Sequence, residues 1–465
     1  MATGSSSTEA WVAEETIDRL SSDFGEPPAQ AEYRREALKA FRELALEPNP
    51  LYRKYGYWSG VDLTGLDPRE RGPAIALPGA LPNSIVVMHD GQGTRAKIPP
   101  SLVSAGVEFQ SYPELLRGSG APHPEPETSP PLEFPDRLGA LGAALTNRGY
   151  RLRIPSGVSE PVQLHDFLVL SIPHEARSVR RVIEVGDGVT FLGTEETYSL
   201  GTTVEHQRWC SSEVSIHAGR ASRVAFLTVH SPDPLAVSYY ARQAVAGPES
   251  HLSWVFSGFG GFRTKIRNSS TLLGNASDVE DLQSFYGDGD QSYDSSVNLT
   301  HKGTDTHGQS ITRGVFKDRS RGMSRGLVRI EHEARKTLSF LSEHAMLLSR
   351  GTRSDTIPIL EILCRDVKAT HSSSVAPVDP EKVFYLESRG LPESEAIRAI
   401  GEGFLSHVLG RAPISRLREI LYPLLTRRWE GHAVAFDAPG IGLLPELAFS
   451  TGEEPGDWRF DTKLR

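Results

Sequence analysis

One histidine stands where a run of short apolar segments gives way to a helical pattern. His371 closes the stretch Leu360–His371, and the helical pattern begins at Asp379. Because side chains alternate between two faces along a strand, His371 is expected on the same face as Leu363 and Val367. A neutral imidazole can offer a ring nitrogen to iron or another transition metal, whereas a core histidine would pair it with a backbone group. On the residues alone both interpretations are open, with the core histidine favoured.

Other reactive residues give weaker patterns. Gly322-Met-Ser-Arg-Gly326 has the letters of a nucleophile elbow, but an elbow leads into a helix and this stretch leads into another strand pattern. Cys364 or Cys210 with a histidine would make a nucleophilic pair, although their spacing does not indicate one. A phosphate-binding loop of the form GxxxxGKS or GxxxxGKT does not occur in the sequence, so we expect the chain to bind no nucleotide.

Composition narrows the classes of function. The chain has 465 residues, a net charge of -9 and two cysteines, which lie far apart in the sequence. The negative charge argues against a general nucleic-acid binder, because clustered Lys and Arg are needed to neutralise phosphates. Two distant cysteines make no disulfide framework, and no stretch approaches the roughly 18 apolar residues of a membrane span. With a small, polar start and no visible signal peptide, the sequence predicts a soluble cytoplasmic protein without a membrane partner.

The elements that would position His371 follow from the apolar pattern. Helical spacing occurs over 11–24 and 31–46, and an irregular, proline-rich stretch then extends to residue 135. From 136 to 376, short apolar runs recur between Gly, Asp, Asn and Ser without a long helical pattern among them. Doubly wound α/β folds need crossover helices, so a β-sandwich, a propeller or a β-solenoid remains. No blade repeat of about 40 residues is visible, and the spacing fits a solenoid with irregular coils.

The C-terminal part is predicted to be helical from 377 to 430. Asp379 can cap a helix with Pro380 at its first position, and Gly390 ends it. Apolar residues continue at helical spacing and form a stripe, which either packs internally or docks a partner. The residues that would dock a partner are Phe384, Tyr385, Ile397, Ile400, Phe404 and Leu405. The tail from 431 to 465 has no assigned role.

Three stretches have a distinctive order of residues: Arg313–Gly322 (RGVFKDRSRG), Leu360–His371 (LEILCRDVKATH) and Asp379–Gly390 (DPEKVFYLESRG). They resemble stretches of the SufB/SufD family of iron–sulfur cluster assembly proteins, and the SufD type is the nearer one. The resemblance covers most of the chain and is most specific from Gly314 to Leu405. It implies a mainly β fold with a right-handed parallel β-helix (β-solenoid) over 136–376. An N-terminal region (1–135) and a C-terminal region (377–430) would be α-helical.

The resemblance also implies a function. The chain would be a non-catalytic subunit of a SUF-type scaffold, not an enzyme, with iron or a transient iron–sulfur cluster as its cargo. Its partners would be the SufC ATPase, docked through the C-terminal helices, and a SufB-like subunit or a second copy of the chain. The SufD histidine that matches His371 lies near the subunit interface in the family. The SufB type has cysteines near the positions of His344 and Cys210, so these two residues and Cys364 are secondary candidate ligands. Ser372 stands where the SufB type has a glutamate.

Two other functions remain open. A β-helix enzyme that acts on polysaccharide would need a groove lined by charged residues, and Asp278, Asp281, Asp288 and Asp290 form a loose acidic group in the sequence. A solvated loop explains the same aspartates, and an exported enzyme would carry a signal peptide. The second alternative is a structural paralogue that has lost the cluster site, which a His371 variant would distinguish.

Overall fold

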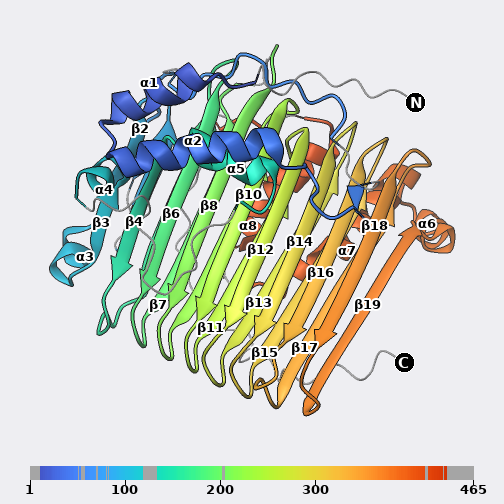
Figure 1. Ribbon diagram of the computed structural model, residues 1–465. Helices are drawn as coiled ribbons and strands as arrows, with labels where there is room; N and C mark the ends of the chain where they lie inside the picture. The colour runs from blue at the N-terminus through green and yellow to red at the C-terminus, as the bar shows by residue number, and fades with distance from the viewer. Residues whose placement is uncertain are drawn as a thin grey trace.

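Two long sheets lie face to face and are joined strand by strand through turns (Figure 1). The computed structural model describes residues 11–50, 52–53, 58–69, 72–79, 81, 83–118, 134–201, 205–413, 417–432 and 434–436. Most of the tail from 431 to 465, to which no role was assigned, lies outside the described residues. From residue 148 onward, consecutive strands alternate between the two sheets, so the chain winds as a β-solenoid of about 8 turns. The expected β-solenoid is confirmed, and the sandwich and the propeller are excluded.

Each sheet is an almost uninterrupted parallel stack. The ten-stranded sheet contains, in spatial order, β19 (Val367–Pro377), β17 (Thr337–Leu347), β15 (His307–Phe316), β13 (Asp278–Gly287), β11 (His251–Gly258), β9 (Arg223–Ser231), β7 (Thr190–Ser199), β5 (Val162–Leu170), β1 (Ser84–Asp90) and β2 (Gly93–Lys97). The nine-stranded sheet contains β18 (Arg353–Ile362), β16 (Arg321–Ile330), β14 (Ser292–His301), β12 (Arg263–Leu272), β10 (Ala236–Ala246), β8 (Arg208–Ala218), β6 (Ala176–Val185), β4 (Arg148–Ile154) and β3 (Glu108–Ser111). Among these strands only the pairs β1–β2 and β3–β4 are antiparallel, and both lie at the N-terminal end of the stack.

Helices cover the outer faces of the two sheets (Figure 1). On the nine-stranded sheet lie α1 (Glu14–Phe24), α2 (Pro28–Glu43) and α5 (Arg137–Leu145), whose apolar residues pack with those of β8 and β10. On the ten-stranded sheet lie α7 (Glu393–Leu409) and α8 (Leu417–Trp429), which pack over β9, β11, β13 and β15. The short helices α3 (Pro100–Ser104) and α4 (Tyr112–Gly118) flank β3, and α6 (Pro380–Glu387) follows the last strand. The helices expected over 11–24 and 31–46 are therefore present with shifted ends.

The core has an inner part between the sheets and two outer parts beneath the helices. Strands in the middle of the stack are consequently buried on both faces, as every residue of β5 illustrates. Buried parallel strands read as continuous apolar runs rather than alternating ones, which matches the runs in the sequence. The inner space, here called the lumen, is not purely apolar. Buried Arg181 bridges Asp166 and Glu195 across it, with Arg181 Nη1 3.0 Å from Glu195 Oε1.

The turns at one edge of the solenoid repeat the same backbone conformation. A residue with positive φ recurs at Ala221, Glu249, Ala276, Asp305 and Lys336. Such a conformation is strained for a residue with a side chain. Each of these residues donates its backbone N–H to a carbonyl oxygen of the next turn, for example Ala276 to Thr304 at 2.9 Å and Lys336 to Asp366 at 2.7 Å. The stacked turns therefore hold one another in register.

The sheets begin earlier in the chain than the solenoid was predicted to begin. The strands β1, β2 and β3 lie within the stretch up to residue 135 that was expected to be irregular, and β1 pairs in parallel with β5. Among the described residues, the helices are too short or too polar to cross a membrane.

Candidate functional site

The C-terminal end of the solenoid is open. In the described part of the chain, β18 pairs with β16 and β19 pairs with β17, and neither has a strand on its other side. Apolar side chains are exposed at this end, namely Ile362 (43%), Leu363 (42%) and Val375 (39%). An open edge with unpaired backbone groups and apolar side chains is a site for pairing with another chain.

His371 points into the lumen at this open end. It lies on β19 in register with Leu341 of β17, which is fully buried in the inner core. Val367 and Ala369, on the same face of β19, pack against that core as well. His371 itself is exposed because no further coil covers it, and none of the described residues forms a hydrogen bond with its ring. The prediction of a buried, backbone-satisfied histidine is therefore wrong, and the imidazole is free to bind a ligand.

The strand assumed for His371 is interrupted. β18 ends at Ile362 and β19 begins at Val367, so Leu363, Cys364 and Arg365 lie in the turn between them. The predicted common strand face of Leu363 and His371 is therefore wrong, although Val367 does share the face of His371. Cys364 is half-buried against the inner core, outside the strand that carries His371.

A buried carboxylic acid lies one coil below the open end. Glu343 of β17 faces the lumen, two residues from Leu341 and in register with Ser373 of β19. Its Oε1 accepts a hydrogen bond from Ser324 Oγ at 2.9 Å, while its Oε2 has no partner among the described residues. Burial raises the pKa of Glu343 to about 7. In the sequence, Glu343 is two residues from Leu341 and therefore shares its strand face. An acidic residue at such a position indicates a buried carboxyl group, which was not predicted.

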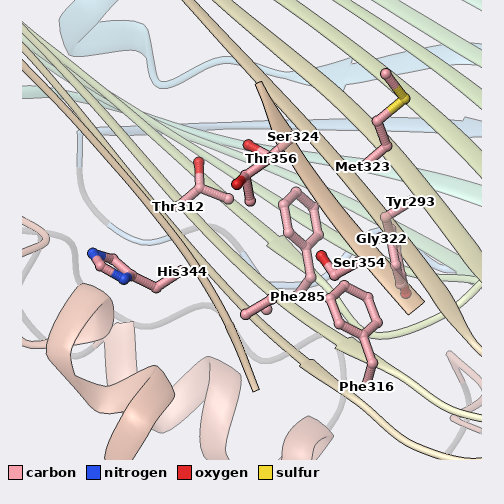
Figure 2. Close-up of a pocket in the computed structure, with 12 residues that line it drawn as sticks. Phe285, Tyr293, Thr312, Phe316, Gly322, Met323, Ser324, His344, Ser354 and Thr356 are labelled. Atoms are coloured by element: carbon pink, nitrogen blue, oxygen red, sulfur yellow. The ribbon is translucent and has the colours of Figure 1, made fainter. Parts of the chain in front are cut away.

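A small cavity lies in the lumen (Figure 2), and Ser324, which donates the hydrogen bond to Glu343, is one of the residues that line it. Its volume of about 20 Å³ has room for a single water molecule. The wall combines the rings of Phe285 and Phe316 with the hydroxyl groups of Thr312 and Thr356. Thr312 Oγ1 is buried without a hydrogen-bond partner among the described residues, so a water at this place would satisfy it.

His344 lies on the opposite face of its sheet from His371. Its ring points away from Phe285 and Phe316 and toward the C-terminal helices in Figure 2. Its Nδ1 is 2.5 Å from Ser374 Oγ and its Nε2 is 3.3 Å from Ser372 Oγ. Burial and two positive neighbours, Arg313 and His407, lower the pKa of His344 to about 4. The two histidines therefore do not converge on one site.

Cys210 is remote from the open end. It is fully buried between the sheets on β8, and four strands of the nine-stranded sheet separate β8 from β18. Burial raises the pKa of its thiol. A protonated thiol is a poor nucleophile and metal ligand. The structure thus places Cys210, Cys364, His344 and His371 in four different environments.

The apolar stripe of the C-terminal helices is divided between the surface and the core. Phe384 and Tyr385 on α6 are 70% and 56% exposed. On α7, Ile397, Ile400 and Phe404 are half-buried. Leu405 is completely buried against the ten-stranded sheet, so it belongs to the outer core and is not free to dock a partner.

The four aspartates of the alternative enzyme hypothesis do not line one groove. Asp278 is bound by His251 and His307, and Asp281 faces the lumen, where Asn268 donates a hydrogen bond to it. Asp288 pairs with Arg428 and Asp290 with Arg319. In the described part of the chain, no three His, Cys, Asp or Glu side chains come together as a metal site. His371 therefore stands at the open end as a single imidazole.

Several known proteins that are similar to this chain carry names from iron–sulfur cluster assembly. The sequence model of a family described as "SUF system FeS cluster assembly, SufBD core domain" matches residues 173–404, which run from just before β6 into α7. The iron-sulfur cluster assembly protein SufD of Bacillus subtilis is 28% identical over 297 residues, which cover 63% of this chain and 67% of that protein. An iron-sulfur cluster assembly SufBD family protein of Staphylococcus haemolyticus is 21% identical over 313 residues, 67% of each chain. A SufBD family protein of Staphylococcus saprophyticus is 20% identical over 279 residues, 60% of each chain.

Proposed function

Because this chain belongs to the SufB/SufD family of iron–sulfur cluster assembly proteins, and resembles its SufD type, we propose that it is a non-catalytic scaffold subunit of a SUF-type complex. Its cargo would be iron or a nascent iron–sulfur cluster, held transiently. The observation that supports this role is the exposed imidazole of His371 at the open end of the solenoid.

The proposal requires a second subunit at the open end. A single imidazole holds iron weakly, and iron sites in proteins use several N, O or S ligands. A SufB-like subunit, or a second copy of this chain, would cover the exposed Ile362, Leu363 and Val375 and bring the remaining ligands to His371. The cargo site would then form only in the assembled complex and would be sealed from water by the same apolar contact.

The proposal assigns ATP hydrolysis to a separate chain. The sequence has no phosphate-binding loop, and a SufC-like ATPase would dock on α6, where Phe384 and Tyr385 are exposed. α6 follows β19 directly, and α7 packs on β13 and β15. A movement of the docked ATPase would therefore reach β19, the strand that carries His371, through the short segment between β19 and α6. We place this complex in the cytoplasm.

The test is cluster assembly by a complex with His371→Ala. The complex would be reconstituted anaerobically with its SufB-like and ATPase partners and assayed for cluster transfer to an acceptor protein. We expect the variant to lose most of the transfer and the bound iron, because an imidazole ligand is removed at the interface. His206→Ala is the matched control, since His206 is an exposed histidine just before β8, and four strands of the nine-stranded sheet separate β8 from β18. Unchanged transfer by His371→Ala would instead identify a structural paralogue without a cluster site.

A further inference from the structure

Two arginines and two histidines gather between α7 and the outer face of the ten-stranded sheet. Arg313 of β15 and His344 of β17 are neighbours in register on this face. His407 lies in the last turn of α7 and Arg411 follows the helix, near enough for Arg313 and Arg411 both to act on the His407 ring. This group is called the cationic cluster. It lies on the other side of the sheet from His371 and does not depend on the proposed iron site.

Arg313 is the centre of the cluster and has no counter-ion. Its guanidinium carbon lies 4.9 Å from the centre of the Phe404 ring, so the ring covers one face of the group. Its Nε is buried and forms no hydrogen bond, and no carboxylate among the described residues pairs with it. Burial alone lowers the pKa of Arg313. A half-buried guanidinium without an anion is costly, and buried charges are normally paired.

The two histidines beside Arg313 lose their protons more readily than free imidazoles do. Arg313 and His407 lower the pKa of His344, and Arg313 and Arg411 lower the pKa of His407, each in addition to burial. One acid is near: Glu280 lies 3.7 Å from Arg411, which also donates a hydrogen bond to Gln309 at 3.0 Å. Glu280 therefore faces Arg411 on the far side of the cluster, where burial raises its pKa to about 7, and it leaves Arg313 uncompensated.

Two serine hydroxyl groups lie beside His344 in the cationic cluster. Ser372 and Ser374 of β19 flank the ring of His344, at 3.3 Å and 2.5 Å from its two nitrogens. A guanidinium, two imidazoles and two hydroxyls are the groups with which proteins bind oxyanions, and a stacked guanidinium keeps its N–H edge free for such a ligand. The two arginines would repel a metal cation.

We propose that the cationic cluster binds a small phosphate-type oxyanion. The anion would sit between α7 and the ten-stranded sheet, with Arg313 as its main partner and His344 and His407 beside it. It would join the C-terminal helix to the solenoid and supply the counter-charge that the fold lacks at Arg313. The net charge of -9 and the small extent of the cluster argue for a free anion rather than a nucleic acid.

The test is a titration of the full-length protein with inorganic phosphate, followed by 31P line broadening at ionic strength held constant with chloride. We expect saturable binding to the wild type and at least tenfold weaker binding to Arg313→Gln, because a charge-assisted hydrogen bond is lost. Arg313→Lys, which keeps the charge and loses the planar fork, should bind with intermediate affinity. Arg329→Gln is the matched control, since Arg329 lies on the nine-stranded sheet and pairs with Glu331 and Glu361.

Two results would overturn the proposal: broadening that does not saturate in the wild type, or equal affinity in the wild type and Arg313→Gln. Far-UV circular dichroism and the melting temperature check that Arg313→Gln is folded. If Arg313→Gln does not fold, the binding test is made with His407→Gln instead, because His407 is exposed and its replacement does not disturb the core. That variant should bind phosphate several-fold more weakly, and an unchanged affinity would exclude the site.

Discussion

Glu196 is a carboxyl group buried in the outer core of the ten-stranded sheet. It is 1% exposed, and Tyr198 Oη donates a hydrogen bond to its Oε2 at 2.7 Å. Its Oε1 has no partner among the described residues. Burial raises the pKa of Glu196 from 4.5 to about 7, against the smaller opposing effect of Tyr198. The folded protein therefore holds this proton more tightly than the unfolded chain does.

The change Glu196→Gln should flatten the dependence of stability on pH. A carboxyl with a raised pKa in the folded state stabilises the fold fully below pH 4.5, and this contribution is lost as the pH rises to about 7. At pH 8 the variant should be more stable than the wild type by on the order of 1–3 kcal/mol, and at pH 5 the two should be similar. Urea unfolding at both pH values measures this difference.

Glu361→Gln serves as the control for Glu196→Gln, because Glu361 is exposed and pairs with Arg329 on the surface. It should change the unfolding midpoint little at either pH. A Glu196→Gln variant that is equally stabilised at pH 5 and pH 8 would show that the carboxyl is not titrating in this range.

At the residue scale, the sequence drew attention to His371 but did not predict which residues lie around it. The change from strand to helix and the family motif both drew attention to this histidine. Arg313 opens one of the family-like stretches and Glu343 shares the parity of Leu341, but neither residue was assigned to a face, because the lumen and the outer face are distinguished only by register. One turn, at Leu363–Asp366, was enough to separate Leu363 from the strand face of His371.

Among the elements, α7 holds the C-terminal helices to the solenoid. Leu405 and Val408 are fully buried with Leu282, Ile311 and Val315 of the sheet. One turn before Leu405, on the same face of α7, the helix meets α8 at Gly401, where an added Cβ would lie 2.7 Å from the Trp429 ring. This close contact needs a glycine.

The change Leu405→Ala should weaken this attachment. Removing a fully buried leucine from a packed core costs about 2–5 kcal/mol, and we expect a loss of this size in the free energy of unfolding. Phe384→Ala is the matched control, because Phe384 is 70% exposed on α6 and its loss should cost less than about 0.5 kcal/mol. Denaturant unfolding of both variants compares the two residues. Equal losses would contradict the division of the apolar stripe into a buried part and an exposed part.

Helices and strands differed in how well the sequence predicted them. The helices α1 and α2 followed from apolar spacing. The cap of α5 became apparent only from the structure, where the side chain of Asp136 accepts hydrogen bonds from the N–H groups of Leu138 and Gly139. The strands β1 to β3 were missed because prolines surround them. β2 pairs locally with β1, but the parallel partner of β1 and the partner of β3 lie much later in the chain. Long-range pairing of this kind has no local signal.

For the whole molecule, the apolar runs predicted the class of fold but not its ends. A solenoid needs each terminal coil to be capped or paired, because each coil stacks only on its neighbours. Here the antiparallel pairs β1–β2 and β3–β4 close the N-terminal end. The described C-terminal end has no comparable cover over β18 and β19. This asymmetry became apparent only from the pairing of the strands.

The open end leads to a prediction about assembly, which rests on the proposed end-to-end contact. Ile362→Lys combined with Val375→Lys should prevent pairing through this end. Both side chains are already exposed in the single chain, at 43% and 39%, so the fold should tolerate lysine. Within an interface, the two ammonium groups would be desolvated next to apolar side chains, which is strongly unfavourable. Light scattering after size exclusion, with the chain alone and mixed with a SufB-like subunit, measures the assembly.

The control for the open end is Leu273→Lys, a change at an apolar residue that is 52% exposed and follows β12 in the middle of the stack. It adds a lysine at an exposed apolar position but leaves the open end intact. We expect this control to assemble as the wild type does, while the double variant elutes as a single chain of 50.9 kDa. If the double variant assembles normally, the partner binds elsewhere, and His371 would not then lie at a subunit interface. The cargo site would have to be sought on another face of the solenoid.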